Sequence, residues 1–377
     1  MGAARSTIRV HALIDGLGWG GAEALLADFA LGAPAAGIEL TVGYLLEKDG
    51  SPLAARLRER GVEPEHAPIA GLLRPSAFRS VRRQLAERRP DVVHTHLGYS
   101  DLLGGAAARS LGIPAVASVH TMEWERGARD DLKLRLMGLA RRACAWRTIT
   151  VSEAARRAFL EAGWESAARV VTVHNGIAAE ARPGAGAAVR SELGLRPDDL
   201  VAAMVAVLRP GKGHDVAIEA VGRLRERFPA LRLVVVGDGP ARAEVERLAA
   251  PLGDAVVMTG HREDVLAILD AADVLVHPSR VDAFPGALLE AMAASVAVVA
   301  TSVGGIPEIV EPGVTGVLFE PPPDAGRLSA ALEPLLGDRE RRRELGAAGR
   351  KRFEAEFTVA RWAERLREVY DGAISAR

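Results

Sequence analysis

Short apolar runs alternate with amphipathic segments along almost the whole chain of 377 residues. The apolar runs are rich in β-branched residues, which is typical of buried strands in a parallel sheet. The segments between them place apolar residues at helical spacing, so the alternation predicts an α/β protein with helices on both faces of its sheets. The predicted strands are residues 7–14, 40–46, 91–95, 115–119, 147–151 and 169–173, followed by 200–207, 231–236, 255–259, 273–277, 296–300 and 315–319.

The two series of strands are separated by a stretch of different texture, AAEARPGAGAAVRSELGLRPDD at residues 178–199. It is rich in Gly, Pro and Ala and has no periodicity, so we expect the interdomain linker within it. The prediction is two Rossmann-like, doubly wound domains, residues 1–185 and 186–355, that face a central cleft. One long helix is expected at residues 350–370, and its last part, from about residue 356 to 377, is expected to cross back onto the first domain.

The composition fits a globular protein with two cores, because 49% of the residues are hydrophobic and 26% are charged. With a single cysteine the chain has no internal disulfide. No apolar run follows the N-terminus, and none is long enough to span a bilayer. These features predict a cytoplasmic protein. They leave open a peripheral contact with the inner face of the membrane.

The charge differs between the two halves of the chain. Residues 1–190 carry 25 basic and 20 acidic side chains, whereas residues 191–377 carry 23 and 29. The basic excess gathers in two helix candidates, residues 74–90 and 132–147. These are either solvated helix faces or surfaces for an anionic membrane or a phosphorylated acceptor. Nucleic acid is not expected as a partner, because the positive charge of the N-terminal half is modest and aromatic residues that could stack on bases are few.

A glycine-rich loop, GLGWGGAE, follows the first predicted strand. Gly16, Gly18 and Gly21 fit the dinucleotide-binding pattern G-x-G-x-x-G, and Glu47 ends the next strand at the position of a ribose-binding acid. Taken alone, this loop would indicate an NAD-dependent oxidoreductase.

A second group of polar residues lies in the C-terminal half. Lys212 stands between glycines, after a strand and before a helix, where its ammonium and the helix N-terminus could both meet a diphosphate. It is one of four lysines beside 44 arginines. Asp282 and Glu290 follow the strand at 273–277, and carboxylates are good acceptors for sugar hydroxyls. Gly304 and Gly305 form a further anion-ready helix start or a tight turn.

At this point the chain resembles the retaining glycosyltransferases of family 4, which have the GT-B architecture. The order and spacing of many short motifs carry the resemblance. They are GGAE (20–23), DVVHTH (91–96), SVHT (118–121), VSEAARRAF (151–159), VHNGI (173–177), VVVGDGP (234–240), ADVLVHPS (272–279), the E-x7-E-like segment at 282–290, GGIPEIV (304–310) and GVTGVLF (313–319).

The resemblance implies a role for each matching residue. Glu290 would hold the ribose of a nucleotide sugar, Asp282 would lie near the donor sugar, and Lys212 would neutralise the diphosphate. His120 would contact the transferred sugar, and the loop of Gly20 and Gly21 would approach the phosphates. The backbone of Phe284, Pro285, Gly286, Ala287 and Leu288 would line the sugar and the pyrophosphate.

The chain departs from the family pattern at two positions. Asp282 replaces the usual Glu and is one methylene shorter, which affects the expected donor preference. Val207 stands where an arginine normally accompanies the lysine, so either Arg209 substitutes for it or the diphosphate is held with one cation fewer. Without a substitute, weaker leaving-group stabilisation and reduced activity are expected.

His94 and His96 share one face of a strand end but have no third ligand at metal-binding spacing, so we expect no metal there. They either line the acceptor side of the cleft or make structural hydrogen bonds. Because no Asp-x-Asp motif is present, a metal-independent enzyme without a cofactor is predicted. The loops at 97–104 and 123–131 are expected to select the acceptor.

The predicted function is transfer of a hexose from a nucleoside-diphosphate sugar to a hydroxyl acceptor with retention, UDP-sugars being favoured over GDP-sugars. The acceptor would be a glycan, a lipid-linked compound or a small molecule. Three alternatives stay open: a nucleotide-sugar epimerase, a weakly active or non-catalytic sugar-nucleotide binding protein, and an NAD-dependent oxidoreductase.

Overall fold

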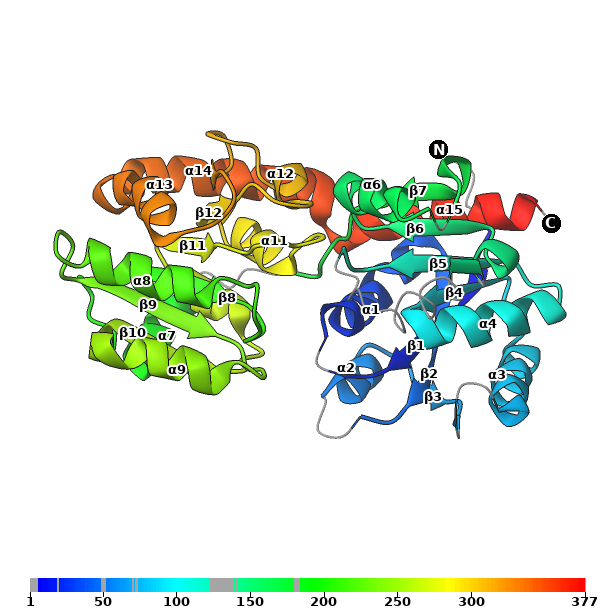
Figure 1. Ribbon diagram of the computed structural model, residues 1–377. Coiled ribbons are helices and arrows are strands. Elements are labelled where there is room, and N and C mark those ends of the chain that lie inside the picture. Colours follow the sequence, from blue (N-terminus) through cyan, green and yellow to red (C-terminus); the bar gives the residue numbers. More distant parts are fainter. Residues whose placement is uncertain are drawn as a thin grey trace. The chain divides into compact units, whose positions relative to one another are not determined.

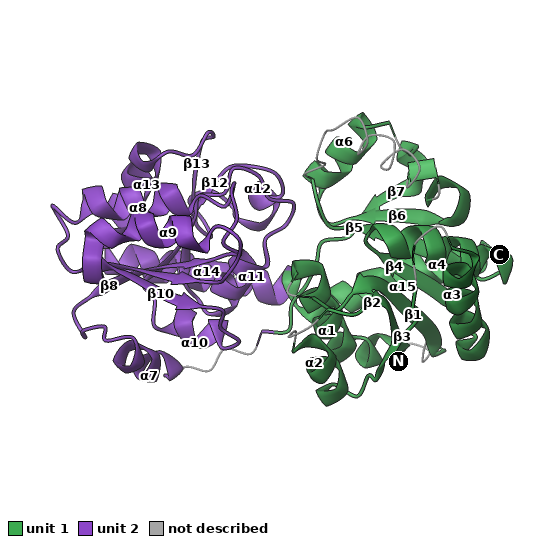
Figure 2. Ribbon diagram, turned by 60° about the horizontal axis from the view of Figure 1, so that its bottom comes forward, with its two compact units in different colours: residues 1–178, 357–377 green, residues 179–356 purple. Residues whose placement is uncertain are grey.

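The structure is a computed structural model that describes residues 6–18, 20–48, 52–69, 71, 74–122, 138–139, 141–163, 165–179 and 184–376. It divides into two compact units (Figure 2). Unit 1 consists of residues 1–178 and 357–377, and unit 2 consists of residues 179–356. Among the described residues, no helix combines the length and the apolar composition needed to cross a bilayer.

Unit 1 is built on a parallel sheet of seven strands in the order β3-β2-β1-β4-β5-β6-β7 (Figure 1). The strands are β1 (Ile8–Gly16), β2 (Ile38–Leu46), β3 (Pro64–His66), β4 (Val92–His96), β5 (Ala115–Val119), β6 (Arg147–Thr150) and β7 (Val170–Thr172). The helices are α1 (Gly21–Gly32), η1 (Pro34–Ala36), α2 (Leu53–Glu59), α3 (Pro75–Arg88), α4 (Gly98–Ser110), α6 (Glu153–Glu161), η2 (Ala167–Arg169) and α15 (Val359–Ser375).

Helices cover both faces of this sheet, and successive residues of β4 are buried on opposite faces. Val92 packs in a cluster with Phe29 of α1 and Trp362 of α15. The next residue, Val93, packs on the opposite face with side chains of α3 and α4, among them Val81. All five residues of β4 are buried, as is usual for a strand inside a parallel sheet.

Unit 2 has a parallel sheet of six strands in the order β10-β9-β8-β11-β12-β13. The strands are β8 (Leu200–Val205), β9 (Leu231–Val236), β10 (Val256–Gly260), β11 (Val274–His277), β12 (Ala297–Thr301) and β13 (Val317–Phe319). The helices are α7 (Ala185–Glu192), α8 (His214–Leu224), α9 (Arg242–Ala249), η3 (Ala250–Ala255), α10 (Val265–Asp270), α11 (Gly286–Ala293), α12 (Ile306–Ile309), α13 (Ala325–Gly337) and α14 (Arg339–Arg352).

The predicted fold class, two Rossmann-like α/β units with parallel sheets, is confirmed. All twelve predicted strands are present, with ends that shift by at most two residues. Strand β3 was not predicted. It is a three-residue strand at the edge of the sheet that begins with Pro64, so it offers neither a β-branched run nor an alternating pattern.

The boundary between the two units, after Ala178, lies in the stretch 178–199 that was expected to contain the linker. The same stretch also contains α7, whose Val189 packs in a core cluster of unit 2. Two other local predictions were wrong. The helix expected at residues 350–370 is broken by a π-helical turn at Phe353–Phe357, after which Thr358 caps α15 by accepting a hydrogen bond from the backbone N–H of Arg361. The expected loop at 97–104 is largely α4. The basic candidate at 132–147 and the loop at 123–131 lie largely or wholly outside the described residues.

Candidate functional site

In unit 2 the strand order reverses between β8 and β11, and open parallel sheets bind ligands beyond the carboxyl ends of their strands at such a point. The loops that follow these two strands lie against each other. The backbone N–H of Arg280 donates to the carbonyl oxygen of Gly211 at 2.7 Å. Gly213 has a φ of +80°, and a Cβ there would collide with the carbonyl oxygen of Pro278. Lys212 is therefore held beside the loop that follows β11.

The ammonium of Lys212 meets the carboxylate of Asp282, with Nζ 2.5 Å from Oδ2. The imidazole of His277 contacts the same oxygen, with Nε2 at 3.0 Å. The side chains of Lys212 and Asp282 are 13% and 12% exposed, and that of His277 is 2% exposed. The structure thus brings together two residues that the sequence singled out and adds a third, His277.

Asp282 is ionised at neutral pH. Burial, the largest influence, acts to raise its pKa, but the hydrogen bonds and charges of His277 and Lys212 together lower the pKa to about 2. His214, at the start of α8, behaves differently, because burial lowers its pKa to about 4. At neutral pH this imidazole is therefore uncharged.

The large side chains at the start of α11 are buried, and the partly exposed residues there are small. Phe284 is 7% exposed and Leu288 is fully buried, whereas Gly286 and Ala287 are partly exposed. The N-cap position is Pro285, whose side chain makes no capping hydrogen bond. The backbone role expected for residues 284–288 toward a ligand stays a prediction. Glu290 lies one turn into the helix and is partly exposed.

Val207 and Arg209 both lie on the exposed side of the loop after β8. Strand β8 ends at Val205, and the side chain of Val207 is 44% exposed. Leu208, between them, is fully buried, and Arg209 is exposed. The apolar residue that replaces the usual arginine is therefore accessible to solvent.

In unit 1 the strand order reverses between β1 and β4, and the glycine-rich loop follows β1. At Gly20 a Cβ would collide with the carboxylate of Glu23, whereas at Gly21 it would meet no atom within 4 Å. Glu23 is 6% exposed, and its Oε1 lies 3.6 Å from Nζ of Lys48. The space beside Gly20 is thus occupied by the chain's own carboxylate, that of Glu23.

Three histidines of unit 1, at residues 94, 96 and 120, take part in buried side-chain hydrogen bonds. His94 is 1% exposed, and its ring nitrogens contact the hydroxyls of Tyr370 and Ser118, each at 2.7 Å. Nδ1 of His96 lies 3.0 Å from Nε2 of His120. Burial lowers the pKa of His120 to about 4, so its ring is neutral at pH 7. For His94 these contacts favour the structural alternative over a lining of the acceptor side.

Within the described part of the chain, no group of three or more His, Cys, Asp or Glu side chains is arranged to hold a metal ion.

Two family models match the chain: Glycosyltransferase Family 4 at residues 19–181 and Glycosyl transferases group 1 at residues 187–352. The D-inositol 3-phosphate glycosyltransferase of Nocardia farcinica is 32% identical over 322 residues, which cover 78% of this chain and 70% of that protein. The chain belongs to the family 4 glycosyltransferases. The alpha-maltose-1-phosphate synthase of Mycolicibacterium smegmatis is 31% identical over 314 residues, or 74% of this chain and 78% of that protein.

A solved structure supports the fold of this glycosyltransferase. Anabaena HepE in complex with UDP and glucose has a TM-score of 0.85 and 22% identity, covering 97% of this chain and 99% of that chain. The family membership replaces the dinucleotide interpretation of Gly16, Gly18 and Gly21. The glycosyltransferase motifs extend through both units, whereas the dinucleotide pattern described one loop.

His277 is the residue of this glycosyltransferase that the sequence analysis missed. A signal was present, because His277 ends the predicted strand 273–277 and therefore had to lie at the ligand-binding edge of the sheet. Its contact with Asp282 depends on how the next loop turns back, and no spacing rule gives that turn.

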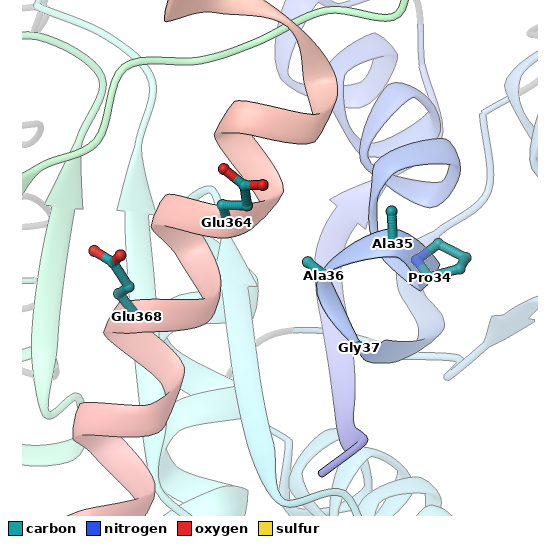
Figure 3. A pocket seen from close by; sticks show the side chains of 6 residues that line it. All are labelled: Pro34, Ala35, Ala36, Gly37, Glu364 and Glu368. Atoms are coloured by element: carbon teal, nitrogen blue, oxygen red, sulfur yellow. The ribbon is translucent and has the colours of Figure 1, made fainter. Parts of the chain in front are cut away.

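A hollow of about 490 Å³ in unit 1 is not a candidate for this site. Figure 3 shows its lining by Pro34, Ala35, Ala36 and Gly37 on one side and by Glu364 and Glu368 of α15 on the other. Gly37 immediately precedes β2, so the hollow lies at the amino ends of the strands, opposite the edge where such sheets bind ligands.

Proposed function

We propose that this glycosyltransferase moves a hexose from a UDP-sugar to a hydroxyl acceptor with retention of configuration and without a divalent metal. One observation carries the proposal: a lysine, an aspartate and a histidine converge beyond the carboxyl ends of β8 and β11, shortly before the N-terminus of α11. A cation beside helix-start amides suits a diphosphate, and adjacent carboxylates suit sugar hydroxyls.

Each residue has a proposed part in holding the donor. Lys212 and the first amides of α11 bind the diphosphate, Asp282 binds the donor sugar, and Glu290 binds the ribose. Gly20, Gly21 and His120 of unit 1 are proposed to contact the phosphates and the transferred sugar, as the family resemblance implies. HepE, similar in fold, has been solved with UDP and with UDP-glucose, which supports UDP as the nucleotide.

The proposed reaction breaks the bond between the anomeric carbon and the phosphate oxygen. Negative charge then develops on the leaving diphosphate, where Lys212 and the backbone amides stabilise it. The acceptor hydroxyl attacks on the same face and gives its proton to the departing phosphate oxygen, so the new glycosidic bond retains the configuration. No protein nucleophile takes part in this scheme.

The acceptor is proposed to be a glycan, a lipid-linked compound or a small molecule with a free hydroxyl. Two of the relatives are named after phosphorylated compounds, an inositol phosphate and a maltose phosphate. Phosphorylated sugars and polyols therefore belong in the acceptor screen beside neutral ones. A peripheral contact of the basic helix α3 with an anionic membrane is part of the same proposal.

The test is a binding and turnover screen with UDP-, GDP- and ADP-sugars, each with and without EDTA. The wild type is expected to bind UDP-sugars most tightly and to lose no activity to the chelator. The variants K212A and E290A are expected to lose at least about tenfold in donor affinity while remaining folded. Their matched controls are K351A and E340A, which change exposed residues of α14 in the same unit.

Several outcomes would contradict parts of this function. Unchanged donor affinity in both K212A and E290A would refute the site. Conversion of the donor sugar without any acceptor would indicate an epimerase, and donor binding without transfer or slow hydrolysis would indicate a binding protein. The anomeric configuration of the product, read from its NMR coupling constant, tests retention.

A further inference from the structure

His277 lies at the centre of the unit 2 site, yet the proposed reaction gives it no part. It is the last residue of β11 and is 2% exposed, with Nε2 at 3.0 Å from Oδ2 of Asp282. Its other nitrogen, Nδ1, is buried and has no hydrogen-bond partner in the described structure. Within the described residues, the His277 ring thus makes one side-chain hydrogen bond, to the carboxylate of Asp282.

Lys212 shares that carboxylate oxygen. Its Nζ lies 2.5 Å from Oδ2 of Asp282, so the ammonium is already paired with a protein anion. A diphosphate that engages Lys212 competes for this charge. Asp282 would then be a largely buried carboxylate that lies near a second anion and is paired less strongly with Lys212. Both features destabilise its charged form.

We propose that His277 is a positioning residue that holds the Asp282 carboxylate while Lys212 is engaged by the diphosphate of the donor. This inference rests on the proposed function. Through Nε2, His277 keeps a hydrogen bond to Oδ2 that no ligand phosphate competes for, because the imidazole is enclosed at the strand end. Asp282 therefore stays oriented toward the sugar, and Lys212 is free to bind phosphate.

The shorter acid at position 282 fits this role. The carboxylate of Asp282 lies within hydrogen-bond distance of the strand end because the intervening loop turns back. Ser279 fixes that turn by donating to the carbonyl oxygen of Val281 at 2.9 Å. The backbone N–H of Gly305 donates to the carbonyl oxygen of Asp282 at 3.1 Å and anchors the loop from the other side.

The test compares H277F, which removes the donor, with H277Q, whose amide nitrogen can take the place of Nε2. UDP affinity is measured by calorimetry, and UDP-glucose turnover gives kcat and KM. We expect H277F to weaken UDP binding by about tenfold and to lower kcat/KM further, whereas H277Q stays within about threefold of wild type.

A double-mutant comparison with D282N shows whether His277 acts through Asp282. The D282N variant removes the competing charge, so it should bind UDP at least as tightly as wild type while losing transfer. In the D282N background, H277F should change UDP affinity by less than about twofold. If H277F is too unstable to study, H277M removes the donor with less added volume.

The outcomes separate this inference from the proposed function. If the wild type binds UDP and H277F binds it equally well, the positioning role of His277 is overturned, while the proposed function stands. Equal losses in H277F and H277Q, or the same loss with and without D282N, would show a merely structural histidine and would also overturn it. A wild type that binds no UDP, GDP or ADP would overturn the proposed function and this inference with it.

Discussion

A single oxygen, Oδ2 of Asp282, accepts hydrogen bonds from Lys212 and His277. Two donors make the burial of this carboxylate tolerable, because an unpaired buried charge would cost several kcal/mol. The same pairing lowers the net positive charge available to a diphosphate. At the scale of single residues, we therefore expect an added cation near Lys212 to raise the affinity for the proposed donor.

Val207 offers a direct test of this reasoning. Its side chain is 44% exposed on the loop that carries Lys212, so an arginine can be accommodated without repacking. We expect V207R to bind UDP up to about tenfold more tightly, because it adds a second charge-assisted donor for the diphosphate. The matched control is V314R, at a loop residue of unit 2 that is 48% exposed. Equal affinities in V207R, V314R and wild type would contradict the expectation.

The buried histidines predict loss of stability in acid. Burial lowers the pKa of His11, His120 and His214 to about 4 and that of His94 to about 3, compared with 6.5 when unfolded. Between pH 6.5 and 4 the unfolded chain thus binds more protons than the folded chain does. The free energy of unfolding is therefore highest above pH 6.5 and falls as the pH is lowered. Each group contributes about 1.4 kcal/mol per pH unit in that window. Urea unfolding at pH 7, 6 and 5 should show decreasing free energies; a flat profile would contradict this.

At the scale of elements, the C-terminal helix α15 completes the core of unit 1. Trp362, Leu366 and Tyr370 are buried with apolar residues of β1 and β4. Arg367 is 3% exposed, and its guanidinium donates to the carbonyl oxygens of Ala36, Gly37 and Ser6. The last helix therefore binds the backbone at the beginning of the chain.

Replacement of Tyr370 by Phe tests the link between α15 and β4. The hydroxyl lost in Y370F is the hydrogen-bond partner of Nδ1 in His94. In the variant this nitrogen would stay buried without a partner. We expect a loss of about 1–3 kcal/mol in the free energy of unfolding. The control is Y44F, because the ring of Tyr44 is partly exposed and stacks on His66. Equal stability of Y370F and Y44F would contradict the assignment.

The basic face of α3 carries the proposed membrane contact. Arg79 and Arg82 are exposed, whereas Val81 and Leu85 of the same helix are buried in the core. Sedimentation with anionic vesicles should fall by at least about threefold in R79E/R82E, because charge reversal removes the attraction to the surface. The control R339E/R343E reverses two exposed arginines on α14 of unit 2. Identical sedimentation of both variants and wild type would contradict a specific α3 surface.

At the scale of the whole molecule, the two units differ in how the chain builds them. Unit 2 is one continuous stretch, and it contains Lys212, Asp282, Glu290 and His277. Unit 1 needs two stretches that are separated by all of unit 2. The donor site proposed for unit 2 is therefore encoded in an uninterrupted segment, whereas the core of unit 1 requires the end of the chain.

Fragments of the chain test this difference. Residues 184–356 alone should fold cooperatively and bind UDP within about tenfold of the full-length affinity. They contain Lys212, α11 and Glu290, which are proposed to hold the diphosphate and the ribose, and lack only the phosphate contacts proposed for Gly20 and Gly21. Residues 1–178 alone should aggregate, because loss of α15 exposes the apolar side chains of unit 1 that Trp362 and its neighbours on α15 cover. Fusing residues 357–377 to that fragment should restore solubility. An unfolded 184–356 fragment would refute the independent folding of unit 2. A soluble and stable 1–178 fragment would refute the need of unit 1 for α15.

Much of the fold followed from local pattern, for a physical reason. Strands inside a parallel sheet are buried on both faces, so β8 is an unbroken apolar run in the sequence and β12 is apolar up to its last residue, Thr301. Strand β3 gains its identity only from pairing with β2, and the break at Phe353–Phe357 interrupts a helical pattern that continues through it. Neither feature has a local signal strong enough to predict it.

The sequence by itself determined the two parallel α/β sheets, the family and the positions of Lys212, Asp282 and Glu290, because these depend on periodicity and on motif spacing. Only the tertiary structure decided which side chains meet: Lys212 and His277 at one oxygen of Asp282, His94 with Tyr370, and Glu23 over Gly20. Such meetings depend on how loops turn and how distant segments pack. That geometry is set by the balance of the whole fold, which no short stretch of residues contains.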